Sequence, residues 1–130
     1  MDYLHQDLTE RIIKCFFKVY NTLGYGFLEK VYERAMMIEL AEEGLSACSQ
    51  YPIEVYYKEQ SVGDYSADII VNEKVVLELK AVEHVVEEHE LQLINYLKAT
   101  DLEIGLLLNF GKKPEVRRKI FTNDRKKIAH

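Results

Sequence analysis

The sequence predicts an α/β (α+β) fold in which helices flank a mixed β-sheet. The N-terminal third holds two segments with apolar residues at helical spacing, and three segments between residues 51 and 80 alternate as strands do. A helix-forming segment then separates the third of these strands from a further apolar strand. A chain of 130 residues has room for one hydrophobic core, so we expect a single domain over 1–130.

Helical periodicity predicts helices over 7–23, 28–43 and 87–100. In the first, apolar residues recur every three or four positions until Gly24 ends the pattern. The second ends at Gly44, because glycine is favoured just past a helix C-terminus. The third begins with acidic residues, which suit the first turn of a helix. The core face expected for the second helix consists of Leu28, Val31, Tyr32, Ala35, Met36, Ile38 and Leu40.

The expected strands cover 51–59, 62–71, 75–80, 102–110 and 116–121. The first three form an antiparallel meander, with a turn at Gln60 and Ser61. The run 102–110 is apolar at nearly every position, which is typical of a strand covered on both faces. Because a short helix connects it to the strand 75–80, we expect a right-handed crossover and a parallel pair.

Charged residues interrupt two strands that are otherwise suited to burial. Glu78 and Lys80 share one face, because side chains alternate along a strand. A three-residue loop over 72–74 would set Asp68 opposite Glu78 on that face, whereas a two-residue turn would place the carboxylates on opposite faces. A bulge near Asp68 would have the same effect as the longer loop. We therefore expect an odd-length loop or a bulge.

Two facing carboxylates in an apolar hairpin repel each other unless a cation neutralises them. A bound divalent ion is the economical explanation of Asp68 and Glu78, and an ion cluster with a purely structural role is the alternative. On the repulsion argument, replacing either acid with alanine should preserve or raise the stability of the metal-free protein.

Three motifs resemble those of a known group of nucleases. Asp68 followed by Glu78-Leu79-Lys80 resembles the D…(D/E)xK signature of the PD-(D/E)xK nuclease superfamily, although Ala67 stands where a proline often precedes the Asp. The segment GFLEKVY over 26–32 is similar to the motif of the GxxExxY proteins of that superfamily. The segment QLINY over 92–96 resembles the QxxxY motif of RecB-like nucleases.

The resemblance extends over residues 12–121 and implies a restriction-endonuclease-like α-β-β-β-α-β core, with an extra N-terminal helix and a C-terminal strand. It implies a nuclease dependent on Mg²⁺ or Mn²⁺, with DNA favoured over RNA as substrate. The alternative is a catalytically idle module that binds nucleic acid or a protein partner. The implied metal ligands are Glu29, Asp68, Glu78 and the backbone carbonyl of Leu79, and the implied catalytic set adds Lys80, Gln92 and Tyr96.

Charge is distributed unevenly along the chain. Residues 1–111 hold 9 Lys+Arg and 20 Asp+Glu, a balance of −11, whereas 112–130 hold 8 and 2, a balance of +6. We expect 122–130 to form a basic flexible tail. Candidates for phosphate contacts are Lys112, Lys113, Arg117, Arg118 and Lys119, with a solvated terminus as the alternative.

Cysteine usage and hydropathy indicate a cytoplasmic protein. Cys15 and Cys48 show no CxxC spacing, so we expect reduced packing residues and not a disulfide or zinc site. No segment resembles a signal peptide, and no apolar run reaches the roughly 18 residues that span a bilayer. A homodimer, or a protein partner that supplies substrate recognition, is compatible with this reading.

Overall fold

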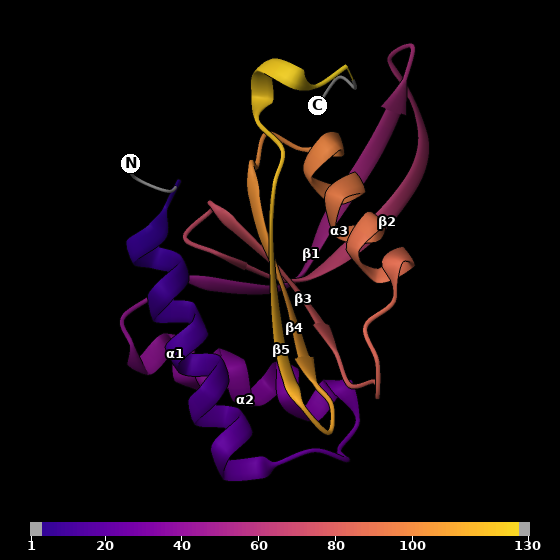
Figure 1. Ribbon diagram of the computed structural model, residues 1–130. Helices are drawn as coiled ribbons and strands as arrows, with labels where there is room; N and C mark the ends of the chain where they lie inside the picture. Colours follow the sequence, from indigo (N-terminus) through magenta and orange to yellow (C-terminus); the bar gives the residue numbers. More distant parts are fainter. Residues whose placement is uncertain (1–3, 128–130) are drawn as a thin grey trace.

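The computed structural model describes residues 4–127 as a mixed five-stranded sheet between two helical layers. The strand order is β1-β2-β3-β4-β5, with α1 and α2 on one side of the sheet and α3 on the other (Figure 1). This architecture confirms the predicted fold class. The elements in chain order are α1 Gln6–Leu23, α2 Glu29–Glu42, β1 Ala47–Tyr57, β2 Gln60–Val71, β3 Val75–Lys80, α3 Glu87–Ala99, β4 Ile104–Phe110, β5 Pro114–Ile120 and the 3₁₀ helix η1 Asn123–Arg125.

The larger core lies between the sheet and the α1–α2 layer. Buried apolar residues of α1 recur at helical spacing, as the sequence predicts, and the helix ends at Gly24 with φ 70°. The face predicted for α2 is partly wrong, since Leu28, Val31 and Ile38 are exposed. Only a narrow stripe of α2 is buried, and the helix contacts α1, β1 and β3. Its buried residues are Tyr32, Glu33, Met36 and Leu40.

The first hairpin differs from its predicted boundaries. The strand β1 begins at Ala47, and the turn lies at Lys58 and Glu59, not at Gln60 and Ser61. Both turn residues have positive φ, 50° and 66°, as two-residue hairpin turns that match strand twist require. Neither residue is a glycine or asparagine, so composition gave no sign of the turn.

The crossover from β3 through α3 to β4 has the predicted parallel pairing. Every residue of β4 is buried, because α1 and α2 cover one face and α3 covers the other. Gly105 permits this close packing, since a Cβ at that position would lie only 2.7 Å from Leu93 Cδ1. The helix α3 therefore lies tightly against the sheet centre.

The second hairpin has the three-residue loop that the sequence predicts. Val71 pairs with Val75, Ile70 with Val76 and Ile69 with Leu77. Asp68 and Glu78 are thus the next residues on the two strands, and the predicted register is confirmed.

The segment after Phe121, expected to be flexible, is attached to the body as far as the structure describes it. Lys126 Nζ donates hydrogen bonds to the backbone oxygens of Thr100 and Leu102 at 2.7 and 2.6 Å. The Arg125 guanidinium lies 4.6 Å from the centre of the Phe121 ring. Residues 128–130 lie outside the described part.

Both cysteines are free thiols, but only Cys15 is a buried packing residue. Cys48 is exposed on β1, so that part of the expectation is wrong. None of the helices formed by residues 4–127 has the length and apolar content needed to cross a membrane.

Candidate active site

The strands β2 and β3 separate at the position of the two acids. Backbone pairing ends at Ile69 and Leu77. Beyond that point the Asp68 carboxylate replaces a backbone acceptor, because its Oδ2 accepts the Leu79 N–H at 2.7 Å. The Glu78 side chain is only 4% exposed and lies in hydrogen-bonding contact with Asp68. The structure therefore brings the two predicted acids together at a gap in the sheet.

Glu78 occupies a strongly perturbing environment. Burial, the hydrogen bond with Asp68 and the charge of Asp68 raise the pKa of Glu78 to about 9, with Lys80 opposing the rise. Its Oε2 atom is buried and has no hydrogen-bond partner among the described residues. Such oxygens almost always have a partner in folded proteins. Glu78 therefore holds a proton at neutral pH and presents an oxygen that a cation or a water could engage.

Glu29 approaches the same acids from the first residue of α2. Partial burial raises the pKa of its carboxyl, Lys80 opposes this rise, and Asp68 adds to it. A cavity of about 190 Å³ is lined by Glu29, Asp68 and Leu79 among others. Within residues 4–127, no three Asp, Glu, His or Cys side chains form a ready-made metal-binding group. Glu29 thus shares a cavity with Asp68 but does not close a three-acid cluster with Asp68 and Glu78.

The loop before Glu29 is held by Tyr32. The Tyr32 hydroxyl donates to Gly24 O at 2.8 Å and accepts the Phe27 N–H at 3.2 Å. Its ring is fully buried and stacks on Phe110 with a centroid separation of 4.3 Å. Gly26, between the two anchored residues, has φ 109°, which favours glycine. Tyr32 and Gly26 therefore fix the point at which α2, and with it Glu29, begins.

Two further predicted site residues, Gln92 and Tyr96, belong to α3. Gln92 Nε2 donates to the Tyr96 hydroxyl at 2.7 Å, across one turn of the helix. Burial and the charge of Glu78 raise the pKa of Tyr96, and the Gln92 hydrogen bond opposes this rise. The charges of both Glu78 and Asp68 thus act on the Tyr96 hydroxyl. Lys80, half-buried at the end of β3, acts electrostatically on both Glu29 and Glu78.

Three polar residues near the acids were not singled out from the sequence. Glu33 is 8% exposed, and its Oε1 accepts a hydrogen bond from Gln50 Nε2 at 2.6 Å. Both line the cavity of Glu29 and Asp68. Asn109 is fully buried and bonds the backbone N–H and oxygen of Val82, which fixes the chain just after Lys80. Glu33 lies four residues after Glu29, and residues at this spacing share one face of a helix. This spacing could have indicated Glu33 as a neighbour of Glu29.

The basic residues proposed for phosphate contacts do not form one surface. Arg117 and Lys119 both pair with Glu90 of α3, and Arg117 also pairs with Glu115 at 2.9 Å. Arg118 points the other way, as strand alternation requires, and donates to Leu4 O at 2.6 Å. Lys112 and Lys113 are exposed in the β4–β5 turn. Lys112 lines a cavity with Gly26 and Leu28, at the start of α2.

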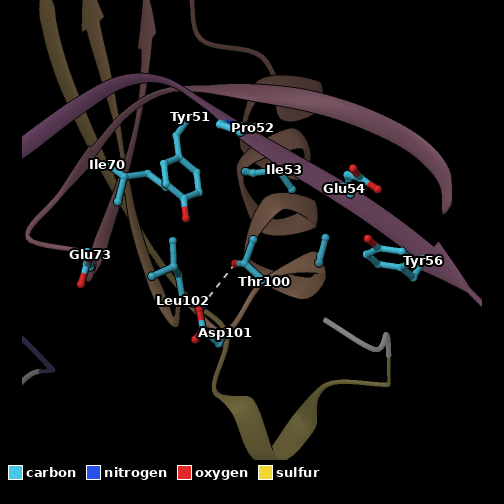
Figure 2. Close-up of a pocket in the computed structure, with 11 residues that line it drawn as sticks. Tyr51, Pro52, Ile53, Glu54, Tyr56, Ile70, Glu73, Thr100, Asp101 and Leu102 are labelled. Atoms are coloured by element: carbon cyan, nitrogen blue, oxygen red, sulfur yellow. Dashed lines mark hydrogen bonds between the residues drawn. The ribbon is translucent and has the colours of Figure 1, made fainter. Parts of the chain in front are cut away.

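A larger cavity lies away from the acids. It has a volume of about 490 Å³ and lies between β1 and the C-terminal end of α3, where Tyr51, Ile53 and Ile70 face Thr100 and Leu102 (Figure 2). None of the predicted site residues lines it.

Asp68 and Glu78 lie at a β2–β3 gap in a mixed sheet flanked by helices, an α/β architecture consistent with a PD-(D/E)xK core. Comparison with protein families matches residues 6–119 to the PD-(D/E)XK nuclease superfamily. The match covers most of the chain, and the protein belongs to this superfamily of metal-dependent phosphodiesterases. Comparisons with curated proteins and with solved structures give no match.

Proposed function

We propose that the protein is a Mg²⁺- or Mn²⁺-dependent nuclease of the GxxExxY type, with DNA as the favoured substrate. The observation that supports this most strongly is the buried Glu78 carboxyl, whose Oε2 lacks a partner beside Asp68. Burying such a group is costly unless a ligand compensates. A divalent cation would compensate the unpaired oxygen, and also the negative charge that Glu78 acquires beside Asp68 when it loses its proton.

The donors around the gap suit a hard cation, which prefers carboxylate and carbonyl oxygens. We assign Glu29, Asp68, Glu78 and the Leu79 backbone carbonyl as the residues that would hold it. Glu78 must first release its proton, and its contact with Asp68 must open. When bound, the cation would stabilise charge on the phosphate oxygens and lower the pKa of a water.

The remaining residues would act on the substrate and the water. Lys80 would orient the attacking water or offset charge that develops on the phosphate. The Tyr96 hydroxyl, oriented by Gln92 at 2.7 Å, can position the water, Lys80 or the phosphate.

A cleavage screen tests the proposal. Labelled single- and double-stranded DNA and RNA are incubated with Mn²⁺ or Mg²⁺, and products are resolved by electrophoresis. We expect DNA cleavage that falls roughly 10²- to 10³-fold in Lys80→Ala, because a preorganised charge at the reacting phosphate is removed. Lys74→Ala, in the exposed β2–β3 loop, is the matched control. Metal and DNA binding without cleavage of any substrate would instead support the idle-module alternative.

Tyr32→Phe should loosen the loop that positions Glu29. The variant leaves Gly24 O and the Phe27 N–H without their partner. We expect a loss of about 1–3 kcal/mol in unfolding free energy. Mn²⁺ affinity should fall about 10- to 100-fold, as for other outer groups that orient metal ligands. Urea unfolding and calorimetric titration measure the two effects, with Tyr25→Phe in the same loop as control. Unchanged Mn²⁺ affinity would show that Glu29 is not a ligand of the metal.

Lys112 and Lys113 are the basic residues that we propose for binding phosphates. The double variant Lys112→Ala/Lys113→Ala should flatten the salt dependence of duplex DNA binding, by up to about 0.9 log units per log salt for each phosphate that is no longer neutralised. Arg117→Ala should change the slope less, because Glu90 and Glu115 already neutralise Arg117. Fluorescence anisotropy across a salt series measures the slopes. Equal slopes in the wild type and the double variant would contradict the assignment.

A further inference from the structure

A cavity of about 470 Å³ lies where the β1–β2 hairpin passes α3, and two residues of the candidate catalytic set, Gln92 and Tyr96, line it. Tyr65 and Leu91 line it and are 52% and 47% exposed, which is high for large apolar side chains. Its volume lies within the range of about 300–1,000 Å³ typical of small-molecule sites. The cavity is thus an apolar recess that the fold leaves open to solvent.

The Tyr65 ring is held in place while part of it stays accessible. Its centroid lies 5.9 Å from that of the buried Tyr96 ring. A Cβ at Gly63 would lie 3.6 Å from Tyr65 Cε2, so the ring passes close to Gly63. Gly63 pairs with Val55, which also lines the cavity. Tyr65 therefore presents a fixed aromatic surface, and its side chain would lose little conformational entropy when a ligand binds.

The polar groups of the cavity include two amides and the Glu88 carboxylate, all at its α3 wall. Gln92 and Asn95 both line it, and such side chains form paired hydrogen bonds with the edges of nucleobases. Gln92 and Tyr96 line this cavity, and the charges of Glu78 and Asp68 act on the Tyr96 hydroxyl. A base bound in the cavity would therefore lie beside two residues of the candidate catalytic set.

We propose that this cavity binds one unpaired nucleobase of the substrate strand, stacked on Tyr65 with Gln92 and Asn95 at its edge. The inference rests on the proposed function and specifies it: the preferred substrate is single-stranded DNA, or duplex DNA with an unpaired end. A base in a duplex is already stacked and paired, and must leave the helix to enter such a recess.

Binding without cleavage tests this inference. The probe is a labelled five-nucleotide single-stranded DNA, with EDTA present and anisotropy as the readout. Tyr65→Ala and Tyr65→Leu should weaken binding about 5- to 100-fold, the range that stacking of one base on an aromatic side chain provides. Tyr65→Phe should bind as the wild type does. Tyr57→Ala is the control, because Tyr57 is 65% exposed at the far end of β1 and does not line the cavity.

Abasic substitution distinguishes a bound base from general adhesion. Removing the base at one position of the probe should weaken binding by the wild type but not by Tyr65→Ala. Equal binding by wild type and Tyr65→Ala, or equal abasic losses in both, would overturn the inference. If the abasic loss depends on Tyr65 but no substrate is cut, the nuclease proposal fails while the base site stands. If DNA is cut but neither binding nor cleavage depends on Tyr65, the base site fails while the nuclease proposal stands.

Discussion

Glu78→Gln is expected to abolish most of the pH dependence of stability in the metal-free protein. The folded protein holds a proton on Glu78 up to about pH 9, whereas the unfolded chain releases it near the ordinary value of 4.5. Below 4.5 both states are protonated, so Glu78 makes no pH-dependent contribution to stability there. Between these values the wild type should lose up to about 1.4 kcal/mol of unfolding free energy per pH unit.

Urea unfolding in EDTA at a series of pH values from about 5 to 9 measures this slope. The difference between wild type and Glu78→Gln isolates the contribution of Glu78 from that of the other acids. Glu73→Gln, an exposed acid in the β2–β3 loop, should keep the wild-type slope. Parallel profiles for wild type and Glu78→Gln would show that Glu78 is ionised in the folded protein at neutral pH.

Asp68→Asn is expected to lower Mn²⁺ affinity by more than about 100-fold, since loss of a direct ligand should exceed the 10- to 100-fold effect of outer groups. Stability without metal should be largely preserved, because the Asn oxygen can still accept the Leu79 N–H. Calorimetric titration and urea unfolding measure the two quantities. Asp64→Asn, an exposed acid of β2, is the control.

Alanine at position 68 should behave differently from what charge repulsion alone predicts. Asp68→Ala leaves the N–H of the buried Leu79 without an acceptor, which costs about 1–3 kcal/mol. The hydrogen bond therefore opposes the gain from reduced repulsion, and Asn is the cleaner test of metal binding. Equal Mn²⁺ affinity in wild type and Asp68→Asn would remove Asp68 from the site.

The register of the acid pair could be predicted because it depends on local rules. Strand alternation puts Glu78 and Lys80 on one face, and only an odd-length loop lets Asp68 meet Glu78. The observed pairing of Val71 with Val75 follows this constraint. The roles of these residues in chemistry stay predictions, since geometry alone does not test them.

The rest of the site depends on interactions between distant segments. The buried Glu33 accepts a hydrogen bond from Gln50. Gln50 lies on β1, which begins earlier than the alternation of its residues suggests. Arg117 and Lys119 look like a basic patch in sequence, but Glu90 of α3 neutralises them in the folded protein. Alternation alone could have separated Arg118 from these two, whereas the pairing with Glu90 required the position of α3.

Calorimetric titration with Mn²⁺ at pH 7, in two buffers of different ionisation enthalpy, tests the metal site most directly. Binding through Glu78 requires its carboxyl to ionise, and metal binding releases such protons to the buffer. We expect wild-type binding with release of about one proton, reduced release in Glu78→Gln, and binding weakened by more than about 100-fold in Asp68→Asn. Binding that releases no proton and is equally tight in all three proteins would contradict the assignment of the metal site.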